Sequence, residues 1–384
     1  MRIFGAVVLA ALLTGAGGAS TGLARAAGPT VIPIDLGTLG GSLSLAAAVS
    51  PSGQVVGESL TGAGQMHAFS WTQSGGMVDL GTLGGPFSSA SDVNGSGQVV
   101  GTSQTAGGQT HAFSWTQSGG MVDLGTLGGT ISFAEAVNAS GQVVGESATG
   151  SGVFHAFSWT QAGGMVDLGT LGGSGSSAAA VSPSGEVVGS ADTAEGEAHA
   201  YSWTRAGGMV DLGTLGGPFS TAVDVTASGQ VIGNSSIGSG PETHAFFWTT
   251  TGGMVDLGSL GGDFSFAGDV SPSGQVVGAS NTAPGSGFHA FSWTQAGGMV
   301  DLGTLGGDFS NAVGVNASGQ VAGNSTLPGN FSSHAFSWTQ AGGMVDLGTI
   351  GGNHSDASAI NARGDIIGNS DTPGGAIHAT LWHT

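Results

Sequence analysis

One short phrase constrains the fold of this chain more than any other feature. A His-Ala-Phe-Ser-Trp type sequence recurs eight times in 384 residues and contains all eight tryptophans. Successive phrases lie 44 or 45 residues apart, and all but the last are followed, twelve residues after the His, by Asp-Leu-Gly. A fixed period of this size indicates stacked supersecondary units that bury their apolar faces against one another. The repeated residues are His67, His111, His155, His199, His244, His289, His334 and His378, with Trp71, Trp115, Trp159, Trp203, Trp248, Trp293, Trp338 and Trp382.

The second unit predicts four strands. Residues 87–93 form a run of strand length that ends at Asn-Gly-Ser-Gly, a hairpin-turn sequence over 94–97. Residues 98–103 supply a second strand, and residues 111–116 alternate large and small side chains with the period of two that a strand requires. A fourth strand is expected over 121–127 after a Gly-Gly turn. Four antiparallel strands in about 44 residues match one β-propeller blade.

The alternation also predicts how the units pack and close. The third strand places His, Phe and Trp on one face and small residues on the other, so the bulky face of one blade can pack on the small face of its neighbour. The last unit stops after its third strand, and a strand at 31–39 can supply the missing fourth. We therefore expect an all-β, eight-bladed propeller of four-stranded antiparallel blades, closed by the N-terminal strand. The alternative is an open β-solenoid, which requires capping ends.

The N-terminal segment of the chain indicates export. Residues 1–26 read as a signal peptide, with Arg2 in a basic start, a short apolar run and small residues near the cleavage position, so residues 27–384 form the expected single repeat domain. Removal of the signal peptide takes the formal net charge from −20 to about −22. Such a charge excludes nucleic acid as a partner. No apolar run is long enough for a transmembrane segment. We expect a secreted or extracellular monomer.

Ser, His and Asp recur in every unit, as at Ser88, His111 and Asp123. A catalytic triad requires one nucleophile, one base and one acid in one pocket, whereas these residue types occur eightfold at equivalent positions. We interpret the repeated His as a structural residue, partly buried between blades and hydrogen-bonded to the backbone or to an Asp.

The units differ mainly in the loop before each His and in the connections between units, and these segments are the candidate ligand-binding regions. The loop before each His has nine residues in the first unit, at 58–66, and ten in units such as the seventh, at 324–333. In a propeller this loop lies on the same face as the blade connections, and variable loops on a rigid scaffold are common binding sites. The connections into units six, seven and eight each carry an Asp or Asn side chain after Gly-Gly. One hypothesis is that these oxygens bind a glycan or Ca²⁺. The alternative is that Asp and Asn are ordinary residues for the start of a loop. The candidate residues are Asp263, Asp308, Asn353 and His354; otherwise no cofactor is expected.

Arg363-Gly364-Asp365 spells a cell-adhesion tripeptide. It occupies the turn at which other units have Ser-Gly-Gln, so we interpret it as a turn sequence.

The region from Asp35 to Trp382 resembles the HAF family of extracellular repeat proteins, on the strength of His67-Ala68-Phe69 and its repeats, Asn-x-Ser-Gly-Gln-Val-Val-Gly and Asp-Leu-Gly-Thr-Leu-Gly-Gly. The fourth unit has Tyr201 in place of Phe, and the last reads His378-Ala379-Thr380. The resemblance implies export and a repeat fold, and it transfers no catalytic residues. We expect a non-enzymatic binding or surface-interaction protein that recognises a glycan, an envelope component or a protein on the variable face. The alternatives are an extracellular polysaccharide hydrolase or lyase, with His354, Asp308 and Asp356 as its only candidate group, and a purely structural secreted repeat protein.

Overall fold

The computed structural model describes residues 31–384, which consist of strands, turns and loops without a helix. The predicted signal peptide lies outside the described residues. Among residues 31–384, no helix has the length and apolar character that crossing a membrane requires.

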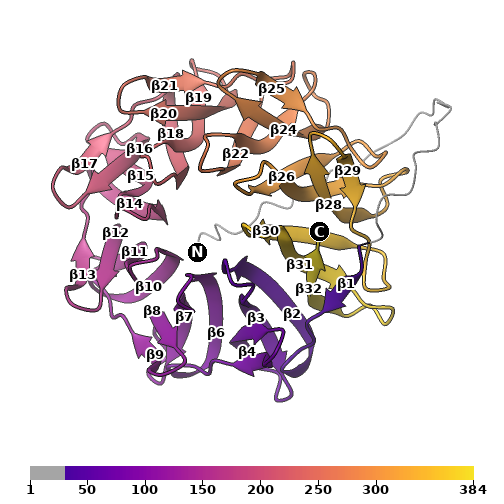
Figure 1. Cartoon of the computed structure of the whole chain (residues 1–384). Coiled ribbons are helices and arrows are strands. Elements are labelled where there is room, and N and C mark those ends of the chain that lie inside the picture. The colour runs from indigo at the N-terminus through magenta and orange to yellow at the C-terminus, as the bar shows by residue number, and fades with distance from the viewer. Residues whose placement is uncertain (1–30) are drawn as a thin grey trace. The chain divides into compact units, whose positions relative to one another are not determined.

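Seven consecutive sheets have four antiparallel strands each, in sequence order from the first strand to the fourth. Figure 1 shows them arranged in a ring with the first strand of each sheet innermost. Blades 1 to 4 comprise β2 (Gly40–Val49), β3 (Val55–Thr61), β4 (Met66–Thr72) and β5 (Gly76–Asp79); β6 (Gly84–Val93), β7 (Val99–Thr105), β8 (Thr110–Thr116) and β9 (Gly120–Asp123); β10 (Gly128–Val137), β11 (Val143–Thr149), β12 (Phe154–Thr160) and β13 (Gly164–Asp167); and β14 (Gly172–Val181), β15 (Val187–Thr193), β16 (Ala198–Thr204) and β17 (Gly208–Asp211).

Blade 8 takes its fourth strand from the start of the described region. Blades 5 to 8 comprise β18 (Gly216–Val225), β19 (Val231–Ile237), β20 (Thr243–Thr249) and β21 (Gly253–Asp256); β22 (Ser265–Val270), β23 (Val276–Asn281), β24 (Phe288–Thr294) and β25 (Gly298–Asp301); β26 (Ser310–Val315), β27 (Val321–Thr326), β28 (Ser333–Thr339) and β29 (Gly343–Asp346); and β30 (Ser355–Ile360), β31 (Asp365–Asp371), β32 (Ile377–His383) and β1 (Pro33–Asp35). The eight-bladed propeller is confirmed, and the solenoid alternative is wrong.

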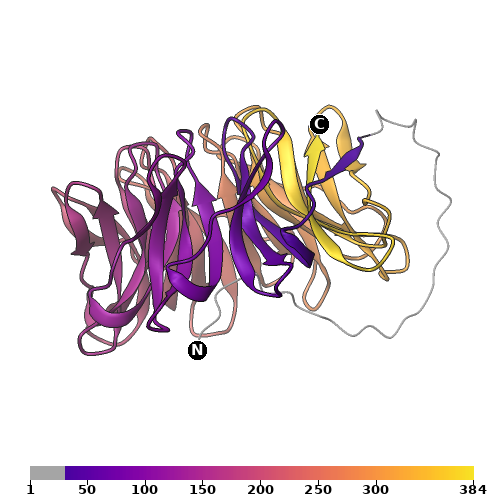
Figure 2. The ribbon, with the colours of Figure 1, turned by 90° about the horizontal axis from the view of Figure 1, so that it is seen from below.

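The N-terminal strand closes the ring as predicted. β1 pairs antiparallel with β32, with Asp35 opposite Thr380, in the register that Asp79 and Phe69 have in blade 1. β32 also meets the innermost strand of blade 1 through the pair Leu43 and Ile377. The side view in Figure 2 shows β1 beside the last strands of the chain. The closing strand is shorter than the predicted 31–39, because residues 36–39 already form the connection into blade 1.

Other predicted boundaries were wrong in the second unit, where the first strand begins at Gly84 instead of residue 87. The fourth strand ends at Asp123 instead of residue 127, because Gly125 has a left-handed φ of 75° and donates its N–H back to Asp123 Oδ1, which turns the chain after a last backbone bond from Leu124 to Ala112. The second strand runs to Thr105 instead of residue 103 and the third begins at Thr110 instead of residue 111, because the Thr105 N–H donates to the Gln109 carbonyl and continues the hairpin. The predicted turn at 94–97 is present, and Asn94 caps it by accepting the Ser96 N–H.

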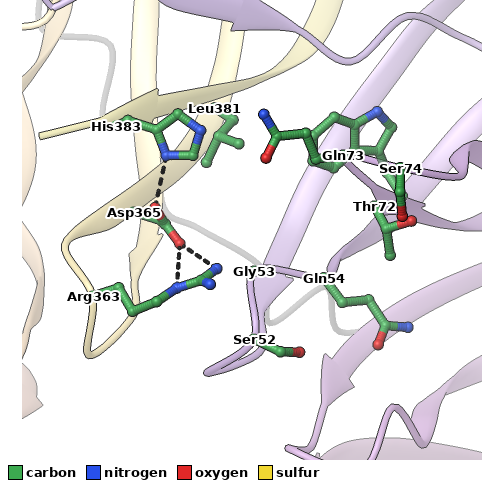
Figure 3. Close-up of a pocket in the computed structure, with 11 residues that line it drawn as sticks. Ser52, Gly53, Gln54, Thr72, Gln73, Ser74, Arg363, Asp365, Leu381 and His383 are labelled. Atoms are coloured by element: carbon green, nitrogen blue, oxygen red, sulfur yellow. Dashed lines mark hydrogen bonds and ion pairs between the residues drawn. The ribbon is translucent and has the colours of Figure 1, made fainter.

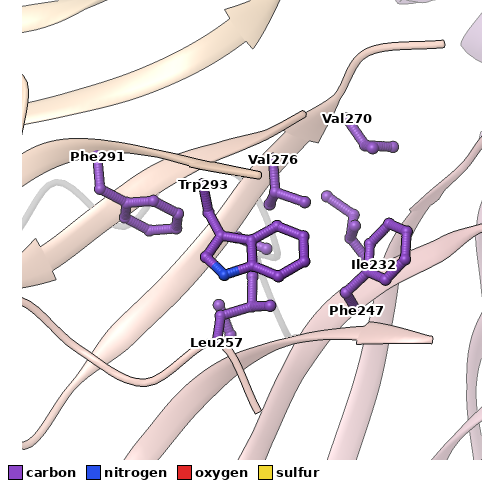
Figure 4. Packing of buried hydrophobic residues seen from close by; sticks show 9 residues of the cluster. Ile232, Phe247, Leu257, Val270, Val276, Phe291 and Trp293 are labelled. Atoms are coloured by element: carbon purple, nitrogen blue, oxygen red, sulfur yellow. The ribbon is translucent and has the colours of Figure 1, made fainter. Parts of the chain in front are cut away.

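Blades pack by pairing bulky with small side chains, as the alternation predicted. Phe113 of blade 2 is fully buried and packs with Val56, Ala68 and Leu80 of blade 1. Figure 4 shows the same arrangement between blades 5 and 6, where Phe291 and Trp293 lie in one buried cluster with Ile232 and Leu257. Burial of one such aromatic side chain contributes about 1.5–3 kcal/mol, so eight equivalent interfaces hold the ring together.

The glycine after each Val-Val pair is needed for close backbone approach. A Cβ at Gly101 would overlap the Ser89 carbonyl oxygen of the innermost strand. Gly101 pairs with Ala90 next to a register shift, and this bulge bends the innermost strand around the centre of the ring.

Candidate functional site

The strand order separates two faces of the ring. The connector face carries the loops between second and third strands together with the segments that join successive blades. The turn face carries the hairpin turns between first and second strands and between third and fourth strands. Strands alternate in direction, so these two sets of loops lie at opposite ends of every blade.

Each repeated His pairs with an Asp through Nδ1. In blade 2 the distance between His111 Nδ1 and the nearer oxygen of Asp123 is 2.8 Å, and Asp123 Oδ1 also accepts the Gly125 N–H. His378 makes the equivalent bond with Asp35, so the closing strand completes this pairing in blade 8. The imidazole is the more buried partner in all eight pairs, with 13–25% of the side chain exposed against 40–43% for the Asp. This geometry fixes the connection after the fourth strand and agrees with a structural role.

The repeated Ser does not join a triad. Ser88 Oγ accepts the Ala68 N–H and donates to the Gly81 carbonyl, both in the preceding blade. Its hydroxyl is therefore occupied by backbone groups and contributes to blade packing. Within residues 31–384, Ser88 and His111 are not hydrogen-bonded to each other. The contact between nucleophile and base that activation requires is therefore not made.

The predicted ligand sector on the connector face is built around Asp308. The Asp308 N–H donates to Asn330 Oδ1 at 2.9 Å, and Asn330 Nδ2 donates back to Asp308 Oδ2 at 2.8 Å. Asn330 has a φ of 59°, and it is the one residue other than glycine with positive φ in residues 31–384. The left-handed backbone and the paired hydrogen bonds hold the 327–332 loop in one conformation. The next residue, Phe331, is 91% exposed.

The other three candidate residues lie around this loop. His354 Nδ1 accepts the Ser333 N–H at 3.3 Å, so the connection into blade 8 contacts the end of the same loop. Asp263 and Asn353 occupy the equivalent connections of blades 6 and 8. The structure joins Asp308 to Asn330 within the 327–332 loop and His354 to Ser333 just after it, and within the described region no side-chain hydrogen bond joins Asp263 or Asn353 to them.

In the same sector, Asp356 Oδ1 accepts from Asn369 Nδ2 at 3.0 Å, and His354 Nδ1 accepts the Ser333 N–H at 3.3 Å. Among residues 31–384, no three His, Asp or Glu side chains are grouped in a way that could hold a metal ion.

A cavity that sequence reasoning missed opens on the turn face between blades 8 and 1. It has a volume of about 540 Å³ and is shown in Figure 3. Arg363, Asp365 and His383 from blade 8 form one side, and the turns of blade 1 form the other. The blade 1 lining residues are Ser52, Gly53, Gln54, Trp71, Thr72, Gln73 and Ser74.

Asp365 organises this cavity, which we call the seam pocket. His383 Nδ1 lies 2.8 Å from Asp365 Oδ1, while Arg363 Nε and a terminal nitrogen donate to Oδ2 at 3.1 and 2.8 Å. Asn361 Nδ2 also donates to Oδ2 at 2.8 Å. Burial by itself raises the pKa of the Asp365 carboxyl, but the hydrogen bonds from Asn361, His383 and Arg363 outweigh it and lower the pKa below its ordinary value. The carboxylate is therefore ionised and fully engaged.

The Asp365–His383 pair reverses the pattern of the eight repeat pairs. Here the carboxylate side chain is 9% exposed and the imidazole 48% exposed. The free ring edge thus lies at the solvent-accessible end of the pair. The signal in the sequence was the departure of the eighth unit from Ser-Gly-Gln at the turn and from Thr after the last Trp. The burial of Asp365 also supports the interpretation of Arg363-Gly364-Asp365 as a turn, since an adhesion motif must present its carboxylate.

Gly53 allows the two blades to meet at this pocket. Its φ is 85°, and a Cβ at this position would overlap the Arg363 guanidinium. Glycine tolerates this left-handed backbone, so the blade 1 turn can lie directly against the arginine.

No family model and no curated protein matches this sequence. Solved structures do match. Dipeptidyl peptidase 4 of Porphyromonas gingivalis is 10% identical, with a TM-score of 0.56 over 88% of this chain and 56% of that chain. TolB of Acinetobacter baumannii is 12% identical, with a TM-score of 0.39 over 74% of this chain and 63% of that chain. The BP39L lectin of Burkholderia pseudomallei is 11% identical, with a TM-score of 0.43 over 81% of this chain and all (100%) of that chain.

These similarities concern the fold. The chain spans 63% of TolB and 56% of the peptidase, so it matches less than two thirds of either. At these low identities, the β-propeller architecture is the property that the solved structures share with this protein.

Proposed function

We propose that this protein is an exported, non-enzymatic propeller of the HAF type that recognises a glycan on its connector face. The observation that carries the proposal is the 327–332 loop, which presents Phe331 almost fully exposed from a loop held by the Asn330–Asp308 hydrogen bonds. Exposed apolar side chains scattered singly are common, so the proposal rests on the fixed conformation of this loop together with a second exposed ring, Phe309, beside Asp308.

The chemistry of the sector suits a sugar. Phe309 follows Asp308 and is itself exposed, so two aromatic rings come from chain segments that Asn330 and Asp308 tie together. Aromatic rings pack on the C–H faces of a sugar, and carboxylate and amide oxygens accept hydrogen bonds from its hydroxyls. Asp308 Oδ2 is already bonded to Asn330, which leaves Oδ1 available to a hydroxyl.

Contacts between neighbouring loops hold this sector in shape before a ligand binds. Gly287 of the blade 6 loop lies so close to the Asp308 backbone that a Cβ would overlap the carbonyl oxygen. Loops of blades 6 and 7 and the connection into blade 8 therefore contact one another in sequence, which reduces the conformational entropy that a ligand must restrict.

A glycan array tests the proposal with the mature chain and three variants. We expect Phe331→Ala and Asp308→Ala each to weaken binding of the selected glycan by about tenfold or more, and His354→Ala to weaken it less, because His354 contacts only the backbone at the end of the loop. Phe219→Ala is the matched control, since Phe219 is an exposed Phe in β18 of blade 5, away from the loop. Absence of binding on the array, or equal binding by the Phe331→Ala variant, would refute glycan recognition here and favour the structural alternative.

A further inference from the structure

We propose that the seam pocket is a second binding site, which takes an acidic sugar of the hexuronate type through its carboxylate. This inference concerns the turn face and does not depend on glycan binding at the 327–332 loop. Its basis is the position of Arg363: the chain has four basic side chains against 24 acidic ones, and Arg205 and Arg363 are the two that lie in residues 31–384.

Arg363 has donors left for a ligand. A guanidinium carries five N–H groups, and Asp365 accepts from Nε and from one terminal nitrogen. The contacts with Asp365 and Gly53 fix the plane of the guanidinium, so its remaining N–H groups are oriented before a ligand arrives. A fixed guanidinium is the side chain best matched to a carboxylate, which it can bind with two parallel hydrogen bonds.

His383 supplies a second oriented group. The ionised Asp365 carboxylate can only accept, so the hydrogen between the two residues belongs to His383 Nδ1. In the neutral ring Nε2 therefore carries the lone pair and can accept a hydrogen bond from a sugar hydroxyl. The eight repeat pairs do not offer this, because their imidazoles are the buried partners.

The remaining lining matches a polyol. Thr72, Gln73 and Ser74 lie across the cavity from His383 and Arg363, as Figure 3 shows, and Ser52 lies below them on the blade 1 turn. Hydroxyl and amide groups of this kind exchange hydrogen bonds with sugar hydroxyls. The volume of about 540 Å³ falls within the usual range for small-ligand pockets and accommodates a monosaccharide or a disaccharide. Asp365 is the one carboxylate of the lining, and both of its oxygens are engaged. Its negative charge offsets that of Arg363, so a ligand carboxylate is recognised through the Arg363 N–H groups that Asp365 leaves free.

Calorimetric titration of the mature chain with glucuronate and galacturonate tests this site, with glucose, galactose and acetate as comparison ligands. We expect at least one uronate to bind at least tenfold more tightly than its neutral sugar and than acetate, because it alone combines a carboxylate with hydroxyls. Arg363→Gln should weaken that binding by tenfold or more. The matched control is Arg205→Gln, which makes the same change in charge at an exposed turn of blade 4 on the same face and should leave binding unchanged.

A consensus variant, built from residues that other units carry, distinguishes loss of binding from loss of folding. Arg363→Ser, Asp365→Gln and His383→Thr together give blade 8 residues that other units of this chain carry at the same positions, so the ring should remain folded while uronate binding is lost. The proposal is overturned if neither uronate binds, if neutral sugars bind equally well, if Arg363→Gln or the folded consensus variant binds like the parent, or if Arg205→Gln loses binding to the same extent. Phe331→Ala should keep uronate binding, which separates this test from that of the connector face.

Discussion

The ring closure makes a quantitative prediction at Leu36, the residue that follows the closing strand. Leu36 is 5% exposed, packs in the cluster that contains Phe69 and Leu381, and donates its N–H to the Ala379 carbonyl at 3.0 Å. Leu124 is its equivalent in blade 2, where it is 6% exposed and donates to Ala112 at 3.0 Å. If blade 8 is as well formed as the others, the two leucines should contribute equally to stability.

Leu36→Ala removes buried methyl groups and leaves a cavity, so it should lower the free energy of unfolding by about 2–4 kcal/mol. Leu124→Ala should lower it by the same amount to within about 0.5 kcal/mol. The entropy of unfolding near 2.1 cal/mol/K per residue gives about 0.7 kcal/mol/K for a domain of about 350 residues. A loss of 3 kcal/mol should therefore lower Tm by about 4 °C in both variants.

Urea denaturation followed by tryptophan fluorescence measures both variants directly, and calorimetry gives Tm. Closure by the N-terminal strand would be refuted if Leu124→Ala destabilised the protein as expected while Leu36→Ala left the urea midpoint and Tm unchanged. A partial loss at Leu36 alone would mean that blade 8 opens before the rest of the ring.

Three further predictions address single features of the fold. Tyr201 is fully buried with no partner for its hydroxyl in the described residues, so Tyr201→Phe should stabilise the protein by about 1 kcal/mol in urea denaturation, and a loss of stability would show that the hydroxyl is satisfied. Burial, with the neighbouring Asp269 carboxyl, raises the pKa of Asp224 well above its ordinary value, so the folded state binds the proton more tightly than the unfolded state does. Stability should then fall as the pH rises from about 4 through the folded-state pKa, and Asp224→Asn should flatten this dependence of the urea midpoint; an unchanged slope would contradict it. Gly101→Ala should destabilise by about 3 kcal/mol or more, whereas Gly107→Ala, whose Cβ would meet Thr105 Oγ1 at an ordinary contact distance of 3.7 Å, should change the midpoint little.

The regular part of the fold follows from the sequence because each repeat has the same alternation of large and small side chains and the same turn residues. Alternation in residues 111–116 sets the third strand, and Asn94 with Gly97 sets the hairpin turn, where Gly97 has a φ of 83°. The error at the end of the fourth strand arose where a local turn overrides composition. Leu124 still bonds the Ala112 carbonyl, but Gly125, with a φ of 75° and its N–H bonded to Asp123, turns the chain into the connection.

The two candidate sites differ in how far the sequence could reveal them. Asp308 and His354 were found because they depart from the residue type of other connections, but Asn330 and Phe331 gain their meaning only from the loop conformation. The pairing of Asn330 with Asp308 spans 22 residues, and nothing in the spacing predicts it.

The seam pocket illustrates a different limit. Arg363, Asp365 and His383 were visible as departures from the repeat, yet the first two are adjacent to a turn and the third is 18 residues beyond Asp365, so each could be explained alone. Their relation appears only when β31 and β32 pair and place Asp365 opposite His383. The same pairing exchanges burial between acid and base relative to the other eight pairs. A chain that uses His and Asp eight times to fasten its blades therefore contains a ninth pair whose imidazole is left accessible, and this pair lies where blade 8 meets blade 1. Substitutions at this junction should alter ligand binding with little effect on the other seven blades, because each blade contacts only its neighbours.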